Sequence, residues 1–183
     1  MMILMNYYAI QTKTRSEEKF IRLFRSLHPH LNFPMYFPKK QLINRQKGVL
    51  KPSIHAVFPG YIFIEAEHDD LLASQWEFRK TKSFYRFLKS NQDISPLAGK
   101  DLELVFHFIN MAGALAGISK VEYNENSRII VLEGPLAGLE GKIIKVDKRK
   151  KRAKVKLNLY DDSFVIDFAF EIIGKAEFKE GDA

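Results

Sequence analysis

The sequence predicts an α+β domain followed by a small β-barrel, and three observations support this fold class. In the first two thirds of the chain, strand-like and helix-like apolar patterns follow one another in the order β-α-β-β-α-β-α. The last third instead holds short stretches rich in β-branched residues, separated by glycines and aspartates. A small, glycine-containing transition separates the two patterns. We therefore expect a domain over residues 1–112, in which helices flank one antiparallel sheet, a linker over 113–122 and a barrel over 123–183.

The elements of the first half of the α+β domain follow from local patterns. Residues 7–10 form an aromatic, apolar run that predicts a buried strand. Hydroxyl and acidic residues over 14–18 are typical of a helix start, and the apolar residues after them keep helical spacing until Pro29. Residues 31–37 are predicted to be extended. The basic segment 39–55 has little apolar periodicity and is predicted to be a mobile hairpin or loop.

The second half of this domain begins with the most strand-like segment, residues 57–65, which a Pro59-Gly60 kink interrupts. A second helix is predicted from Asp69 through Trp76, and a strand over 84–88. Ser95-Pro96 predicts the start of a third helix, because serine is a favourable cap and proline fits the first helical position. The apolar residues that follow define its expected inner face: Leu102, Val105, Phe108, Ile109 and Ala112.

Four short strands are predicted in the barrel, over residues 128–132, 142–147, 153–159 and 164–168. Residues 153–159 alternate strictly between apolar and polar side chains, which indicates a strand with one buried face. Glycine, proline and aspartate residues separate the strands. Several strands this close together are typical of a small, partly open barrel.

Composition argues against several functional classes. The chain has no cysteine, which excludes thiolate chemistry and disulfides and fits a cytoplasmic location. Gly134, Gly138 and Gly141-Lys142 look superficially like a phosphate-binding loop, but Ile143 stands where a serine or threonine would bind magnesium. The histidines lack metal-ligand spacing. We therefore expect no enzyme activity, no cofactor and no metal. No apolar run is long enough for a membrane span, and a monomer is expected.

The charge favours a polyanionic partner, because the net charge is +7 and the isoelectric point is about 9.5. One dense basic cluster stands between two predicted strands, with six cations in the seven residues 148–154. This cluster is either a solvated hairpin tip or a patch that binds RNA phosphates. The candidate RNA-binding residues are Lys148, Arg149, Lys150, Lys151, Arg152 and Lys154.

Aromatic residues make up 13% of the chain, and we expect about half of those in the predicted strands to fill the core. Because strand neighbours point to opposite faces, the others should be exposed. Tyr61 follows the Pro-Gly kink and is expected to be one of the exposed rings.

Two segments in this order resemble a known family. Residues 57–64, Val-Phe-Pro-Gly-Tyr-Ile-Phe-Ile, are similar to the Phe-Pro-Gly-Tyr signature in the N-terminal domain of the NusG transcription elongation factors. Residues 131–142 resemble the glycine-centred turn of the small SH3-like barrel called KOW. The resemblance extends from Tyr7 to Ile173 and implies these two domains.

The resemblance also implies binding sites on the N-terminal domain. A hydrophobic concavity receives the clamp helices of the largest subunit of RNA polymerase in the family. The matching positions are Tyr7, Tyr8, Phe58, Pro59, Gly60 and Tyr61. Two basic turns face the non-template DNA strand in relatives, and the corresponding residues are Lys13, Arg15, Arg79, Lys80, Thr81 and Lys82. A simpler interpretation of Arg79 and Lys80 is an exposed helix end whose cations lie near the negative end of the helix dipole. Lys82-Ser83 replaces the Pro-Gly of many members.

In the KOW domain, Leu159 and Tyr160 match a loop that contacts a small-subunit ribosomal protein or the termination factor Rho in the family. Asp161-Asp162 replaces Gly-Arg and inverts the local charge. This difference suggests a specialised paralogue similar to LoaP or RfaH.

The resulting hypothesis is a transcription elongation factor that binds RNA polymerase and promotes antitermination or processive elongation on specific operons. Its expected partners are the clamp helices and the non-template DNA strand, together with nascent RNA, a ribosomal protein or Rho. One alternative is the general NusG factor, which couples polymerase to Rho or to the ribosome. Another is an RNA- or ribosome-binding protein that merely carries a KOW domain.

Overall fold

The computed structural model describes residues 5–89, 92–126 and 128–173, which fall into two compact units. The first unit comprises the chain up to Lys39, Ala56–Leu115 and Asn158–Asp162. The second comprises Lys40–His55, Ala116–Leu157 and the residues from Ser163. The change of unit at Leu115 falls inside the predicted linker 113–122, but that segment is not a plain linker, because strand Leu115–Ala116 and most of strand Ser119–Tyr123 lie within it. The outermost residues of the two predicted domains, 1–4 and 174–183, lie outside the described residues.

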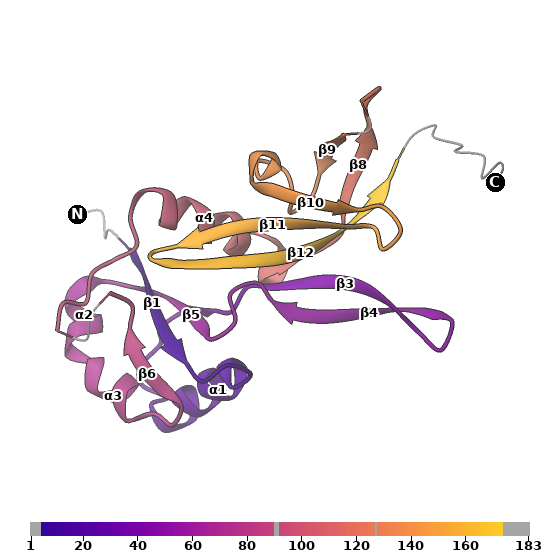
Figure 1. Ribbon diagram of the computed structural model, residues 1–183. Coiled ribbons are helices and arrows are strands. Elements are labelled where there is room, and N and C mark those ends of the chain that lie inside the picture. Colours follow the sequence, from indigo (N-terminus) through magenta and orange to yellow (C-terminus); the bar gives the residue numbers. More distant parts are fainter. Residues whose placement is uncertain (1–4, 90–91, 127, 174–183) are drawn as a thin grey trace. The chain divides into compact units, whose positions relative to one another are not determined.

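The first unit is built around a four-stranded antiparallel sheet with the order β2-β5-β1-β6 (Figure 1). Its strands are β2 (Met35–Tyr36), β5 (Tyr61–Ala66), β1 (Asn6–Thr12) and β6 (Phe84–Phe87). In the β1–β5 register, Tyr8 lies opposite Ile64 and Ile10 opposite Ile62. These four side chains share one face of the sheet, because alternate strand residues point to the same side.

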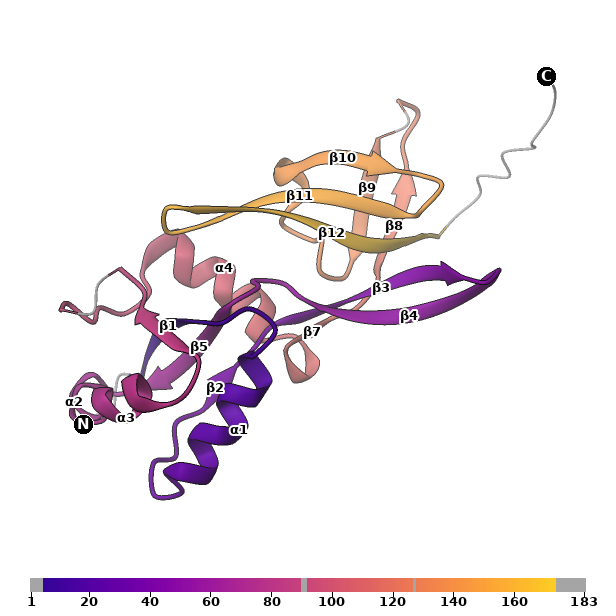
Figure 2. The ribbon, with the colours of Figure 1, turned by 60° about the horizontal axis from the view of Figure 1, so that its bottom comes forward.

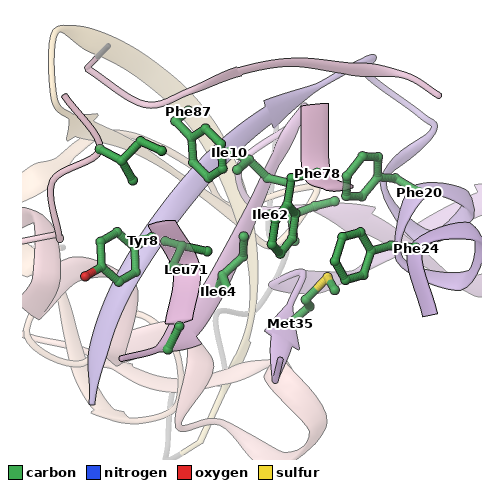
Figure 3. Packing of buried hydrophobic residues seen from close by; sticks show 12 residues of the cluster. Tyr8, Ile10, Phe20, Phe24, Met35, Ile62, Ile64, Leu71, Phe78 and Phe87 are labelled. Carbon is green, nitrogen blue, oxygen red and sulfur yellow. The ribbon is translucent and has the colours of Figure 1, made fainter. Parts of the chain in front are cut away.

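Three helices cover that face: α1 (Glu17–Leu27), α2 (His68–Ala73) and α3 (Gln75–Lys80). Phe20 and Phe24 from α1 pack with Phe78 from α3 against the strand residues (Figure 3). The rings of Phe24 and Phe78 are stacked with centroids 4.1 Å apart. The apolar stripe predicted for the first helix therefore forms the main core of this unit.

Helix α4 (Gly99–Ile109) packs with the other set of strand side chains. Phe108 of α4 meets Phe58 with a centroid distance of 5.7 Å, and Phe58 also contacts Phe63. Phe63 lies opposite Ala9 in the register and so points away from the face of Tyr8 and Ile10. The sheet is consequently covered on both sides, which is why most of its rings are buried.

The predicted start of the third helix at Ser95-Pro96 is wrong. The Leu97 N–H donates to the Tyr7 carbonyl oxygen at 2.6 Å, so this stretch runs extended beside β1 and the helix begins only at Gly99. Proline also disfavours helical geometry in the residue before it. The buried face of α4 is accordingly Leu104, Val105, Phe108 and Ile109; Leu102 is only half-buried and Ala112 is exposed.

Other predicted boundaries also shift. The predicted second helix is two short helices, α2 and α3, which meet at Ser74. In the predicted extended segment 31–37, only Met35–Tyr36 pairs as a strand. The strand predicted over 57–65 begins at Tyr61, because the residues before it form a turn.

The basic segment 39–55 is a regular hairpin of β3 (Lys39–Gln46) and β4 (Val49–Ala56), shown from the side in Figure 2. Its turn residues Lys47 and Gly48 have φ angles of 49° and 82°, as a two-residue type I′ turn requires. Sheet pairing continues to β7 (Leu115–Ala116) in the order β4-β3-β7. The hairpin alternative predicted for this segment is therefore confirmed. The sequence did not separate it from a loop, because its exposed side chains show no period-two apolar pattern.

The second unit contains a five-stranded sheet with the order β10-β11-β12-β8-β9. The strands are β8 (Ser119–Tyr123), β9 (Ile129–Glu133), β10 (Ile143–Asp147), β11 (Arg152–Leu159) and β12 (Asp162–Ile172). Strand β12 pairs in parallel with β8, which was not predicted. The predicted alternation in β11 is confirmed, since Ala153, Val155 and Leu157 are buried between more exposed residues.

Candidate functional site

The Phe58-Pro59-Gly60-Tyr61 segment forms a tight turn whose shape follows from its residue types. The Tyr61 N–H donates to the Phe58 carbonyl oxygen at 3.1 Å. Proline suits the second position of a type II turn, and the third position requires a positive φ, which Gly60 has at 87°. A Cβ at Gly60 would lie 3.2 Å from Thr14 Oγ1 and 3.3 Å from the Thr12 carbonyl oxygen. The turn therefore needs glycine for both its conformation and its packing.

Hydrogen bonds from two other elements hold this turn. The Gly60 N–H donates to Oε1 of Glu17, the first residue of α1, at 2.6 Å. The N–H of Thr12, at the end of β1, donates to the Gly60 carbonyl oxygen at 2.7 Å. Glu17 is only 3% exposed. This arrangement, the Gly60 clasp, joins the end of β1, the start of α1 and the start of β5.

The predicted polymerase-binding residues do not line one open hollow. Tyr8 and Phe58 are buried on opposite faces of the sheet, the first against α1 to α3 and the second against α4. Tyr61 is 2% exposed, so the expectation that its ring is exposed is wrong. Gly60 is buried as well, while Tyr7 is half-buried and Pro59 is exposed. Coverage of both sheet faces explains why strand alternation alone overestimated the exposure of these rings.

An accessible aromatic cluster lies on the face of the sheet that α4 covers, and it consists of Tyr7, Tyr36 and Phe106. Tyr7 lies edge-on to Phe106 with centroids 4.6 Å apart, and its ring is 6.3 Å from that of Tyr36. The Tyr36 hydroxyl donates to Glu65 Oε2 at 2.7 Å, which raises the pKa of Tyr36 to about 12 and orients its ring. All three rings are half-buried. Tyr36 and Phe106 were not predicted from the sequence, although alternation in β1 already placed Tyr7 away from Tyr8.

Residues Asn158–Asp162, which include the predicted partner loop, belong to the first unit. The Tyr61 hydroxyl donates to Asp162 Oδ2, and burial together with this carboxylate raises the pKa of Tyr61. The Tyr160 N–H donates to Asp101 Oδ1 at 3.1 Å. Leu159 is buried and Tyr160 is half-buried, with its pKa raised to about 12 by burial and by Asp101. In this structure the loop therefore contacts other residues of the chain, namely Tyr61 and Asp101.

The two predicted basic turns of the first unit are held together. The Lys13 N–H donates to the Ser83 carbonyl oxygen at 2.9 Å, which joins the turn after β1 to the turn after α3. Both turns are tight, since Arg15 and Ser83 have φ angles of 67° and 78°. The exposed cations that these turns carry are Lys13, Arg15, Lys80 and Lys82. We call this group the basic surface.

Two residues predicted to bind DNA make contacts with residues of α3 instead. Thr81 is 2% exposed, and its hydroxyl donates to the Glu77 carbonyl oxygen at 2.7 Å, so the side chain faces the interior. The Arg79 guanidinium donates to Gln75 Oε1 at 2.9 Å and lies 4.9 Å from the centre of the Trp76 ring. Arg79 thus stabilises α3 and lies on an exposed indole. These contacts join residues three or four positions apart, so helical spacing could have indicated them, whereas the burial of Thr81 depends on packing and could not be read from the sequence.

The predicted RNA-binding cluster lies on the turn between β10 and β11 and on the start of β11, and its cations divide into two groups. Arg152 and Lys154 lie 4.0 Å and 3.3 Å from Asp167, and the Lys148 ammonium lies 4.7 Å from the centre of the Tyr123 ring. The exposed tip is Arg149, Lys150 and Lys151. The backbone N–H of Lys150 donates to Asp147 Oδ1, and this bond and the surrounding cations lower the pKa of Asp147.

Among the described residues, no group of three or more histidines, cysteines and carboxylates is placed to hold a metal ion. Within the same residues, no helix has the length and apolar character needed to cross a membrane.

A family model described as "Transcription termination factor nusG" matches residues 5–106, more than half of the chain. The chain belongs to the NusG family. A second model, for the KOW motif, matches residues 125–156 and confirms the second NusG module. The identification of the family and of its two-domain fold class from sequence is therefore confirmed.

Curated relatives of this NusG-family chain are distant but of similar length. A protein named "Transcription termination/antitermination protein NusG" from Helicobacter pylori is 23% identical over 164 residues, covering 86% of this chain and 90% of the relative. The protein of the same name from Thermus thermophilus is 23% identical over 185 residues, covering 93% and 98%. A solved structure described as "Domain interaction in Thermotoga maritima NusG" aligns with a TM-score of 0.44 and 13% identity, over 91% of this chain and 94% of the other.

Proposed function

We propose that this NusG-family protein is a transcription elongation factor that binds RNA polymerase and promotes antitermination or processive elongation on specific operons. The observation that carries this proposal is the match of both NusG modules, in order, within one chain. The names of the relatives support the coarser part of this proposal, a role in transcription termination and antitermination. The charge-inverted Asp161-Asp162 loop supports a specialised rather than a general factor.

The polymerase contact is proposed at the accessible aromatic cluster, which includes Tyr7. Pro59, the other accessible member of the predicted set, lies near the opposite end of β1 and is proposed as a second point of the same contact. Half-buried aromatic rings supply a large apolar area at low entropic cost, which suits a groove that receives helices. Tyr8, Phe58 and Gly60 have a supporting role, because they fix β1 and the turn from inside. Tyr61 joins the contact only where its bond to Asp162 is released.

A second contact is proposed between the basic surface and the non-template DNA strand. Exposed lysines and arginines gain affinity by releasing counterions from phosphates. Convergence of two turns onto one surface supports a shared ligand rather than two independent solvated loops. Lys148 to Lys154 would contact nascent RNA in the same complex, mainly through the exposed tip.

The general NusG factor remains the second candidate, and the relatives' names favour it. In that function Leu159 and Tyr160 would contact a ribosomal protein or Rho. This requires the loop to leave Asp101 and Asp162 to leave Tyr61. Binding of purified Rho or small ribosomal subunits by the free protein would favour this candidate.

Polymerase binding tests the main proposal. The Tyr7→Ala/Phe106→Ala variant is expected to lose at least about tenfold in affinity for bacterial RNA polymerase core enzyme, because buried aromatic contacts dominate such interfaces. Tyr85→Ala is the control: Tyr85 is 58% exposed on the edge strand β6 and should leave binding unchanged. Affinity is measured with immobilised core enzyme, after circular dichroism has confirmed folding.

A second variant keeps the proposal testable if the first one fails to fold. Pro59→Glu places a charge at an exposed position without touching the core and should also weaken binding. Wild-type affinity of both folded variants would disprove the proposed surface. Absence of any polymerase binding by the unaltered protein would disprove the function itself.

A further inference from the structure

A cavity of about 950 Å³ lies in the second unit between the β3–β4 hairpin, the β10–β11 turn and β12. Figures 1 and 2 both show the hairpin running alongside β12, so these segments are neighbours although far apart in the sequence. Ligand-binding pockets typically have volumes of about 300 to 1,000 Å³. The cavity is therefore large enough for an extended ligand.

The lining combines two kinds of surface. The apolar part consists of Ile43, Leu50, Ile118, Ala169 and Phe170. The cationic part consists of Arg45 from the hairpin, Arg149 to Lys151 from the turn and Arg152 at the start of β11, and the remaining lining residues are Asn44 and Glu171. This pairing of an apolar wall with a row of cations suits a ligand that has flat apolar groups on an anionic backbone.

The cavity has a fixed frame. The Arg152 guanidinium donates to the Ile43 carbonyl oxygen at 3.2 Å and to the Asn44 side chain, which joins the turn to the hairpin. The Phe170 N–H donates to the Lys151 carbonyl oxygen at 3.0 Å, which joins the turn to β12. These bonds assign Arg152 a structural role.

The other cations are available to a ligand. Arg45, Arg149, Lys150 and Lys151 are all exposed, and none forms an ion pair with another described residue. Glu171 is the one carboxylate of the lining and is also exposed. A carboxylate repels phosphate but accepts hydrogen bonds from amino groups of bases and from the ribose 2′-hydroxyl.

We propose that this cavity binds an unpaired segment of RNA, with phosphates on the exposed cations and bases against Leu50 and Ile43. The inference rests on the proposed RNA contact and extends it from the β10–β11 turn to the β3–β4 hairpin. Unpaired RNA is required because duplex bases are stacked and cannot reach an apolar wall. Glu171 adds a preference for RNA over DNA through the 2′-hydroxyl.

Fluorescence anisotropy with the full-length protein and a labelled single-stranded RNA of roughly 10 nucleotides tests this proposal. Arg45→Gln is expected to weaken binding about fivefold and to reduce the salt dependence by about one released ion. The matched control is Lys51→Gln, which removes an exposed cation of the same hairpin that does not line the cavity. This control should bind as the unaltered protein does.

A matched pair of variants also tests the apolar wall of the cavity. Leu50→Ala is expected to weaken binding about threefold or more, through lost contact with bases. Val49→Ala changes the neighbouring residue, which is 56% exposed against 63% for Leu50 but does not line the cavity, and should have no effect. Both positions are on the surface, so folding should be preserved.

The outcomes separate this inference from the proposed function. If Arg149→Gln/Lys151→Gln weakens RNA binding but Arg45→Gln and Leu50→Ala do not, the cavity proposal is wrong and RNA binding at the turn stands. If the protein binds no single-stranded RNA, both RNA proposals fail while polymerase binding remains a separate question. The basic surface can bind DNA independently, so each ligand is compared through the cavity variants: equal losses for duplex RNA, or for single-stranded DNA of the same sequence, on Arg45→Gln and Leu50→Ala would also contradict the proposed site.

Discussion

Lys40 is a buried cation, with 8% of its surface exposed and its ammonium 5.5 Å from the centre of the Phe168 ring. Burial is the main reason that its pKa falls from 10.5 to about 8; Arg152 and Lys154 lower it further, and Asp167 partly offsets them. At pH values between these two pKa values, Lys40 is protonated in the unfolded chain but largely deprotonated in the folded protein, so the unfolded chain binds more protons. Stability should therefore rise with pH over this window, while below about pH 8 the full cost of the buried charge is present.

Unfolding by urea at several pH values tests this expectation. The unaltered protein should gain at most about 3 kcal/mol in the free energy of unfolding as the pH rises from 8 towards 10.5. Lys40→Met should remove this gain and should be more stable than the unaltered protein at pH 7. Lys51→Met, at an exposed position, should keep the pH dependence. A Lys40→Met protein with an unchanged pH profile would show that Lys40 is not the responsible group.

At the scale of elements, the Gly60 clasp explains how a helix, two strands and a turn form one unit. Glu17→Ala should lower the free energy of unfolding by about 1–3 kcal/mol, because it leaves the buried Gly60 N–H without an acceptor. Glu18→Ala is the control: this exposed residue forms an ion pair with Lys39 at 2.9 Å, and such surface pairs contribute about 1 kcal/mol or less. Chemical denaturation followed by circular dichroism measures both. Equal losses for the two variants would contradict the clasp.

At the scale of the whole molecule, the net charge of +7 becomes informative once the fold shows where the exposed cations converge. Lys13→Gln/Lys82→Gln should weaken binding to single-stranded DNA and lower the slope of log affinity against log salt by roughly 1.4, at about 0.7 per phosphate contact. Lys19→Gln/Lys100→Gln removes the same charge from exposed positions outside the basic surface. A DNA-binding titration at several salt concentrations compares the pairs. Identical slopes would mean that only net charge matters.

Local chemistry made several features predictable from sequence alone. Pro59 and Gly60 dictate a turn with a positive φ, alternation in residues 153–159 dictates a strand with one buried face, and apolar spacing after Glu17 dictates a helix. Each of these depends on residues close together in the chain. For the same reason the order of the two domains was predictable, since it follows from the order of such local patterns.

Only the tertiary structure decided which of these residues are accessible. Tyr8 and Phe58 became core residues because helices cover both faces of the sheet, and α4 starts at Gly99 because Leu97 bonds to β1. The basic surface and the 950 Å³ cavity each combine segments far apart in the chain. A sequence specifies what each residue can do locally, whereas burial and convergence depend on which distant element packs against it.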